Sequence, residues 1–258
     1  MSRARWFLWE VAQAITPYTR ARYFTDSFLE CPFDEAALRR VRDVKVRLLV
    51  QHAYEHVPYY RDLFDRERID PREVRTVEDL DRIPVLTKDL LRENFDRLFA
   101  TNFDRTRLVV TSTGGSTGQP THYAQDRDYI EHSQAALMRS WTWSGWRPID
   151  RMAWVGGVDR ERGPLLSAAH RLLTGKLLLN AFDASDSGLA SWCQRIQRHR
   201  PVLYYGYASG LSLLARYAMD HGIELPSARA AVTTAELYPE QAEQIEAGLG
   251  CPVRDFYG

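Results

Sequence analysis

The first hundred residues carry their apolar side chains at helical spacing. Between positions 34 and 56 they recur every three or four residues, the period of one helix face. Asp34 is placed to cap this helix, and Thr87 to cap a second one reaching Phe95. The segment 57–60 breaks the chain between helices, and the spacing predicts a helical layer over residues 1–105. The periodic positions of the first helix are Leu38, Val41, Val44, Leu48 and Leu49.

From residue 107 the pattern changes to short aliphatic runs separated by helical stretches. Gly222 is placed to end one helix and Pro239 to begin the next. Alternation of this kind is typical of an α/β domain with a mainly parallel sheet flanked by helices, which we expect over residues 106–258. The strands are expected at 107–112, 120–124, 152–156, 202–205, 230–234 and 252–256, and the helices at 127–141, 187–200, 208–221 and 238–248.

The charge of the chain narrows the range of partners. Its 258 residues hold 34 basic and 34 acidic side chains, so the net charge is zero. Only Lys45, Lys88 and Lys176 are lysines, and the arginines are interspersed with acids rather than gathered in a stripe. Without a basic field, nucleic acid is not expected as a partner.

The cysteines and the apolar runs indicate in which cellular compartment the protein is expected. Cys31, Cys193 and Cys251 are far apart and form no metal-ligand spacing, which favours a reduced compartment. Cys193 and Cys251 are expected to be buried, inert thiols. No run reaches the length of a membrane helix, and Glu10 interrupts the aromatic opening 6–9. We therefore expect a cytoplasmic protein without a transmembrane segment. The aromatic opening packs on its own domain in one interpretation, or lies on a membrane or partner in the other.

The segment 111–120 carries the clearest chemistry. It follows an apolar run and holds three glycines and five hydroxyl side chains: Thr111-Ser112-Thr113-Gly114-Gly115-Ser116-Thr117-Gly118-Gln119-Pro120. Glycines allow backbone amides to turn toward an anion, and hydroxyls add further donors. The pattern lacks the Gly-Lys-Ser/Thr of a Walker A loop, so it predicts a different kind of polyphosphate cradle.

A serine nucleophile is the main alternative for this segment. Residues 114–118 also fit G-x-S-x-G, which would make Ser116 the nucleophile of an α/β-hydrolase. That motif requires a helix directly after the serine, whereas Thr121 to Ala124 has the pattern of a strand. The acid and histidine of a triad would be drawn from candidates that no spacing distinguishes: Asp159, Asp183, His170, His199 and His221.

The chain resembles the N-terminal part of the adenylate-forming enzymes, in the branch of phenylacetate-coenzyme A ligases and related capsular-polysaccharide-biosynthesis proteins. The hydroxyl- and glycine-rich segment matches the ATP loop of that family. The order and spacing of several short motifs extend the likeness over nearly the whole chain. They are His52-Ala53-Tyr54, Val57-Pro58-Tyr59-Tyr60-Arg61, Ile83-Pro84-Val85-Leu86-Thr87-Lys88, Asn180-Ala181-Phe182-Asp183, Leu203-Tyr204-Tyr205-Gly206-Tyr207-Ala208-Ser209, Thr234-Ala235-Glu236-Leu237-Tyr238-Pro239-Glu240-Gln241 and Tyr257-Gly258.

The resemblance implies a ligase that activates a small-molecule carboxylate with ATP and Mg²⁺ to an acyl-adenylate, and then transfers the acyl group to a thiol such as coenzyme A. Positioning and charge neutralisation would carry the first step. By this likeness the phosphates lie against Ser112, Thr113, Gly114, Gly115, Ser116, Thr117 and Gly118, of which Ser116 and Thr117 are the catalytic candidates. The adenine lies against Thr234, Ala235, Glu236, Tyr257 and Gly258. No protein metal ligand is assigned.

Two departures from the family pattern change the expectation. Thr121-His122 follows Pro120 where many relatives carry a lysine, so His122 is either its substitute or a surface residue. After Tyr257-Gly258 the family pattern would continue to a metal-binding acid, a ribose-binding acid and a C-terminal domain with a catalytic lysine. We therefore expect an incomplete member of the family that is inactive alone and binds ATP weakly, with a non-catalytic nucleotide-binding remnant as another alternative. Its last strand, 253–256, is expected to leave an open edge that forms homo-oligomers.

Aromatic residues near the expected strand ends are the remaining pocket candidates. Tyr205, Gly206 and Tyr207 lie where ligands collect in parallel sheets, and are candidates for substrate binding or for the core. Glu236 either borders the adenine or begins the helix that contains Pro239. The tryptophans near the end of one helix are expected to pack in the core rather than to line an acyl pocket: Trp141, Trp143 and Trp146.

Overall fold

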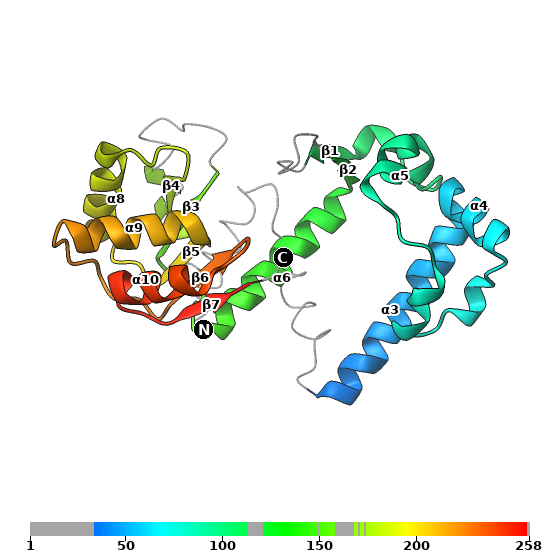
Figure 1. Ribbon diagram of the computed structural model, residues 1–258, viewed down its shortest axis with the longest axis horizontal. Helices are drawn as coiled ribbons and strands as arrows, with labels where there is room; N and C mark the ends of the chain where they lie inside the picture. Colours follow the sequence, from blue (N-terminus) through cyan, green and yellow to red (C-terminus); the bar gives the residue numbers. More distant parts are fainter. Residues whose placement is uncertain are drawn as a thin grey trace. The chain divides into compact units, whose positions relative to one another are not determined.

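The computed structural model describes residues 34–112, 121–148, 150–157, 168–169, 171–172 and 174–256. These residues divide into two compact units, with the border between Ser133 and Gln134. We call residues 34–133 the hairpin unit and residues 134–256 the sheet unit, and describe each by itself (Figure 1). The helix α6 (Arg127–Trp143) contributes residues to both.

The hairpin unit begins with helices, as expected. The Ala37 amide donates to the Asp34 side chain (2.7 Å), which confirms the N-cap. Only Val57 breaks the chain before the next helix, because Pro58 already occupies its first turn, so the expected break over 57–60 is too long. The helical elements are α3 (Glu35–His56), α4 (Pro58–Glu67), η1 (Pro71–Glu73), η2 (Glu78–Arg82), α5 (Lys88–Glu93), η3 (Phe95–Leu98) and η4 (Arg105–Arg107).

The first helix buries a different face from the one its spacing indicates. Val46 and Val50 of α3 pack with Phe64 and Val74, whereas Leu48 and Leu49 are exposed. The second expected helix is also shorter than predicted. The Leu90 amide does donate to the Thr87 hydroxyl (3.2 Å), but α5 ends at Glu93 and a 3₁₀ turn takes over from Phe95.

A two-stranded hairpin follows in the same unit. Strand β1 (Val109–Ser112) pairs antiparallel with β2 (His122–Gln125), so that Ser112 lies opposite His122. The glycine- and hydroxyl-rich segment therefore joins two strands, as predicted.

The sheet unit holds five parallel strands in the order β4-β3-β5-β6-β7. This confirms the α/β class with a parallel sheet. The strands are β3 (Met152–Gly156), β4 (Lys176–Asn180), β5 (Leu203–Tyr207), β6 (Ala230–Thr234) and β7 (Val253–Asp255). Strand β4 was not expected, although Leu177 to Leu179 is the short apolar run of a buried strand.

Helices cover both faces of this sheet (Figure 1). On one face lie α8 (Asp186–His199), α9 (Ala208–Asp220) and α10 (Pro239–Leu249). They pack on alternate strand residues such as Val155, Leu179 and Ala231, and Cys193 and Cys251 are buried in the same core, as predicted. Gly222 follows α9 with φ +61° and Pro239 opens α10, which confirms both helix boundaries.

The part of α6 in the sheet unit packs on the other face. Trp141 and Trp146 are fully buried there against Met152 and Tyr205, so both are core residues as expected, whereas Trp143 is exposed. The ammonium of Lys176 lies 4.9 Å from the ring centre of Trp141 and 5.0 Å from that of Trp154. None of the helices in the described parts of the chain has the length and apolar character that a membrane crossing requires.

Candidate functional site

One group of predicted site residues lies at the mouth of the hairpin. Ser112 ends β1 and His122 begins β2, and both side chains are exposed. The structure thus brings together the first residue of the predicted phosphate segment and the histidine considered as a substitute for lysine. The remaining predicted phosphate ligands, Thr113 to Gly118, lie outside the described residues.

The element that follows this segment bears on its chemistry. The next described element is strand β2 from His122, and α6 begins only at Arg127. A nucleophile elbow needs the serine at a sharp turn from a strand directly into a helix. The observed strand-to-strand connection disfavours the hydrolase interpretation of Ser116.

The second group of predicted residues lies at the carboxyl ends of the parallel strands. The chain passes from β3 to β4 on one side and then returns to β5 on the other side of β3. Between β3 and β5 the strand order therefore reverses, and such a switch point opens a crevice at the carboxyl ends of the strands. The residues found there are Gly156 at the end of β3, Gly157 directly after it, and Tyr207 at the end of β5.

The Phe182 ring and the Tyr207 hydroxyl lie close to Gly157. A Cβ added to this glycine would be 3.3 Å from the Phe182 ring and 3.6 Å from the Tyr207 hydroxyl. Phe182 is 81% exposed and Tyr207 is 38% exposed. The switch point therefore combines a residue without a side chain and two accessible rings, an arrangement that can accept an apolar or planar group.

Tyr205 has a different environment from Tyr207, although the two were predicted together. Its ring packs edge-on against Trp141 and Trp154, with ring centres 5.0 and 4.8 Å away, and the residue is buried. Burial raises the pKa of Tyr205 to about 12, and the side-chain hydrogen bond with Thr234 offsets part of that shift. Tyr205 therefore supports the crevice from the core side, whereas Tyr207 is accessible to a ligand.

Gly206 allows the two central strands to approach each other. Its φ is +155°, and a Cβ at this position would lie 1.9 Å from the backbone oxygen of Val155. A side chain here would separate β3 from β5 at the switch point, so the glycine is required by the close packing of backbone. Gly206 therefore has a structural role, independent of any contact with a ligand.

The segment Thr234 to Glu236 follows β6, beside β5. Thr234 pairs with Tyr207 in the sheet, so these predicted residues are neighbours. Ala235 has φ +67°, a left-handed conformation that costs energy for any residue with a Cβ and that recurs at ligand sites. Glu236 lies before α10 rather than in its first turn. It accepts a hydrogen bond from the Tyr238 hydroxyl, which raises the pKa of Tyr238.

Other predicted ligands cannot be placed in this way. Tyr257 and Gly258 lie outside the described residues. Among the residues that the structure describes, no group of three histidine, cysteine or acidic side chains could hold a metal ion. A magnesium ion that arrives with a nucleotide needs only one or two carboxylates besides the phosphates and water, so this finding is compatible with Mg-ATP.

The sequence of the chain is similar to those of several known proteins. It is 29% identical over 225 residues to a phenylacetate-coenzyme A ligase of Thermus thermophilus, which covers 86% of this chain and 50% of the relative. It is 24% identical over 205 residues to Protein CapK of Staphylococcus aureus, over 77% of this chain and 45% of the relative. The likeness to the phenylacetate-coenzyme A ligase branch of the adenylate-forming enzymes is confirmed. The chain spans about half the length of the curated relatives that it matches.

The fold agrees with this relationship. The structure matches a crystal structure of an open conformation of 2-hydroxyisobutyryl-CoA ligase with a TM-score of 0.66, over 88% of this chain and 54% of the other, at 21% identity. That protein is described in complex with 2-HIB-AMP and CoA. No family model matches the chain.

Sequence reasoning missed two residues of the crevice. Gly157 and Phe182 were not among the predicted substrate residues, although Phe182 belongs to a quoted family motif. Phe182 could be placed beside Gly157 only after β4 was recognised as a strand. Phe182 follows β4, and β4 is the neighbour of β3. An exposed phenylalanine directly after a strand end is the feature that could have indicated it.

Proposed function

We propose that this chain is part of an adenylate-forming ligase that activates a small carboxylate with Mg-ATP and passes the acyl group to coenzyme A. In the first step a carboxylate oxygen bonds to the α-phosphorus as pyrophosphate leaves. In the second, a thiolate bonds to the acyl carbon as AMP leaves. The observation that carries the proposal is strand β2, because a hydroxyl- and glycine-rich connection between two strands suits a phosphate cradle and not a nucleophile elbow.

The residues of the hairpin unit hold the phosphates in this proposal. Backbone amides and hydroxyls of Ser112 to Gly118 donate to the β- and γ-phosphates, with Ser116 and Thr117 nearest the leaving pyrophosphate. Mg²⁺ bound with the nucleotide supplies charge neutralisation. The imidazole of His122, exposed and opposite Ser112, adds a donor on the same side of the hairpin.

The residues of the sheet unit hold the remaining groups. Thr234 to Glu236 border the adenine, together with Tyr257 and Gly258. The acyl group takes the crevice of Gly157, Phe182 and Tyr207, where two rings and a missing side chain accommodate an apolar or aromatic body. Tyr205 positions β5 from the core and makes no direct contact with substrate.

The test is the exchange of labelled pyrophosphate into ATP, over a panel of aryl and alkyl carboxylates, by a version of the protein with the length of its curated relatives, because the chain as given is expected to be inactive alone. We expect exchange that depends on one class of carboxylate and falls at least tenfold in Ser116→Ala, while Ser191→Ala, an exposed serine of α8, leaves it unchanged. A fluorophosphonate probe is run in parallel. Labelling that Ser116→Ala abolishes would support the hydrolase instead.

A measurement of ATP binding distinguishes a non-catalytic nucleotide-binding protein from one that has no phosphate cradle. Calorimetry that shows loop-dependent ATP binding without exchange, for every carboxylate in the panel, would support a non-catalytic nucleotide-binding protein. Absence of both binding and exchange would contradict the phosphate cradle.

A further inference from the structure

Two histidines of the hairpin unit lie on one face of α3, in its last two turns. His52 and His56 are four positions apart, and because an α-helix repeats every 3.6 residues their side chains are neighbours on its surface. The centres of the two rings are 5.0 Å apart, with 49° between the ring planes. Two imidazoles at this helical spacing can bind one metal ion together.

The segment that follows η3 lies against the same part of α3. The Thr101 amide donates to the backbone oxygen of His56 (2.8 Å). The side-chain oxygen Oδ1 of Asn102 lies 3.3 Å from Nε2 of His52. The Phe103 ring meets the His52 ring edge-on, with 6.1 Å between the ring centres. Three consecutive residues thus contact the two histidines, and Asn102 brings an oxygen atom to them.

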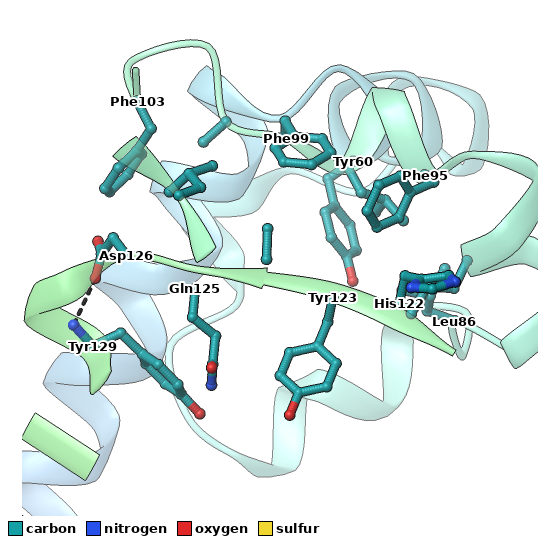
Figure 2. A pocket seen from close by; sticks show the side chains of 15 residues that line it. Tyr60, Leu86, Phe95, Phe99, Phe103, His122, Tyr123, Gln125, Asp126 and Tyr129 are labelled. Carbon is teal, nitrogen blue, oxygen red and sulfur yellow. Dashed lines mark hydrogen bonds between the residues drawn. The ribbon is translucent and has the colours of Figure 1, made fainter. Parts of the chain in front are cut away.

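The same segment forms part of the wall of a pocket of about 480 Å³ in the hairpin unit. Figure 2 shows Phe99 and Phe103 among the side chains that line this pocket, and Ala100 lines it as well. The position of the segment relative to α3 therefore affects the shape of the pocket.

Two separations between these side chains match those of a zinc site. Tetrahedral zinc binds nitrogen and oxygen ligands at about 2.1 Å, which places two ligand atoms roughly 3.4 Å apart and the centres of two imidazole rings roughly 5 Å apart. The observed values are 3.3 Å from Nε2 of His52 to Oδ1 of Asn102 and 5.0 Å between the rings of His52 and His56. The first value is long for an N–H···O hydrogen bond, which is usually about 2.9–3.0 Å.

The charges around the histidine pair suit a cation. His56 is the last residue of α3, and the last turn of a helix favours positive charge. The Glu55 carboxylate lies 3.8 Å from Nε2 of His56. Arg61 donates to the backbone oxygens of Tyr54 and Glu55, and its charge offsets part of this effect. Both histidines are partly exposed, so that an ion can reach them and water can complete its coordination.

We propose that His52, His56 and Asn102 bind one divalent cation of the zinc class, with water as the fourth ligand. Two imidazoles and one amide oxygen suit zinc better than magnesium or calcium, which prefer oxygen ligands throughout. Each imidazole binds through Nε2 as a neutral ring with its proton on Nδ1, so His52 exchanges its contact with Asn102 for a bond to the metal.

The ion joins α3 to the segment after η3 and so fixes one wall of the pocket. Asn102 supplies the third ligand, and it belongs to neither the histidine, the cysteine nor the acidic class. The site is separate from the magnesium that accompanies ATP, and the proposal does not depend on the ligase function.

The experiment titrates Zn²⁺ into the whole chain, expressed without a polyhistidine tag and free of nucleotide, and follows binding by calorimetry. We expect one ion per chain, with an affinity that falls at least about tenfold in His52→Gln and in His56→Gln, because either change ends the joint binding by two imidazoles. Two controls should leave the affinity unchanged. They are His221→Gln, which removes an exposed histidine of the sheet unit, and Cys31→Ser, which removes a thiol.

Asn102 distinguishes a site between two elements from a helical histidine pair alone. The affinity of Asn102→Asp should exceed that of Asn102→Leu at least about tenfold, because a carboxylate is a charged zinc ligand whereas leucine has no donor atom. Zn²⁺ should also slow hydrogen exchange of the Thr101 amide, which is bonded to His56. This measurement on the unaltered chain keeps the test independent of how well the variants fold.

Three results would overturn the proposal. Absence of binding at submillimolar Zn²⁺ would mean that these residues form no metal site. Full affinity in both histidine variants would place the ion elsewhere in the chain. Equal affinities in Asn102→Asp and Asn102→Leu, with unchanged exchange at Thr101, would mean that the helix binds the ion without the neighbouring segment.

Discussion

Strands β5 and β2 are similar in length but differ in what holds them. β5 is the middle strand of five, paired on both sides, and four of its five residues are buried. β2 has one paired strand, and half of its residues are exposed. Packing from both sides of the sheet and pairing with two strands thus hold β5, whereas among the described residues β2 pairs with β1 alone. Substitutions should therefore be costly at the central strands and mild in the hairpin.

The largest effect is expected at Gly206. In Gly206→Ala the new Cβ would overlap the backbone oxygen of Val155, so we expect a loss of about 3 kcal/mol in the free energy of unfolding. Urea unfolding followed by tryptophan fluorescence reports on the sheet unit, which holds all the described tryptophans. Gly222→Ala meets no atom within 4 Å and has only a left-handed backbone to strain, so it should lose about 1 kcal/mol. Equal losses would mean that backbone conformation, not the contact with β3, matters at Gly206.

The next effect depends on pH and concerns the edge strand β4. Burial lowers the pKa of Lys176 to about 8, from 10.5 in the unfolded chain. Between those values the unfolded chain binds the extra proton, so the free energy of unfolding should rise with pH in this window. The indoles of Trp141 and Trp154 favour the charged form and offset part of the shift, which limits the rise to about 3 kcal/mol.

Lys176→Met isolates this titration. Tyrosine and cysteine groups titrate in the same range in both proteins, so the difference between the two stability curves is the quantity to measure. We expect that difference to change by up to about 3 kcal/mol from pH 8 to pH 10.5. A constant difference would show that the Lys176 amine has an ordinary pKa.

A matched pair of valines compares the two units directly. Val232 of β6 is buried and Val110 of β1 is 55% exposed. Val232→Thr puts a hydroxyl into the core and should lower the free energy of unfolding by about 2 kcal/mol. Val110→Thr should change the protection of the hairpin amides in hydrogen exchange by less than about 0.5 kcal/mol. Similar costs at both sites would contradict the contrast between the two strands.

The smallest expected effect is a gain. Ala235→Gly relieves a left-handed backbone, and after the extra entropy of glycine in the unfolded chain we expect about 0.5 kcal/mol of stabilisation in urea unfolding. Ala242→Gly in α10 has no such strain to relieve and should lose about 1 kcal/mol. A loss at both positions would show that the conformation of Ala235 costs little.

The sequence predicts the sheet unit better than the hairpin unit. Apolar runs, together with Gly222 at a helix end and Pro239 at a helix start, located four of the five described strands of this unit and the three helices α8 to α10 to within a few residues. Strand β4 was missed because three leucines in a row have no strand period and favour helix as readily. In α3 the spacing revealed the helix but not its buried face, because that face is set by its contact with α4 rather than by the count of apolar residues.

The candidate site was predictable only where a strand end carries it. Tyr207 and Thr234 are neighbours because β5 and β6 are, which follows from the α/β pattern. The proximity of Phe182 to Gly157 depends on the strand order, and no local pattern in the chain contains that information. Alternation puts Tyr205 and Tyr207 on the same face of β5. Their different environments follow from position along the strand, because Tyr205 packs in the core with Trp141 of α6 whereas Tyr207 is the exposed last residue.

The strand order also bears on how the sheet unit assembles. β3 is the first of its strands to be made, yet its partners lie far along the chain: Met152 pairs with Lys176 on one side and with Leu203 on the other. A chain emerging from the ribosome therefore holds β3 unpaired on its inner edge until β5 has been synthesised. Closing loops of this length precedes the gain from packing, so the sheet unit should fold slowly relative to the local helices α3 and α4. The crevice at the switch point is then completed late, because it forms only when β5 enters beside β3.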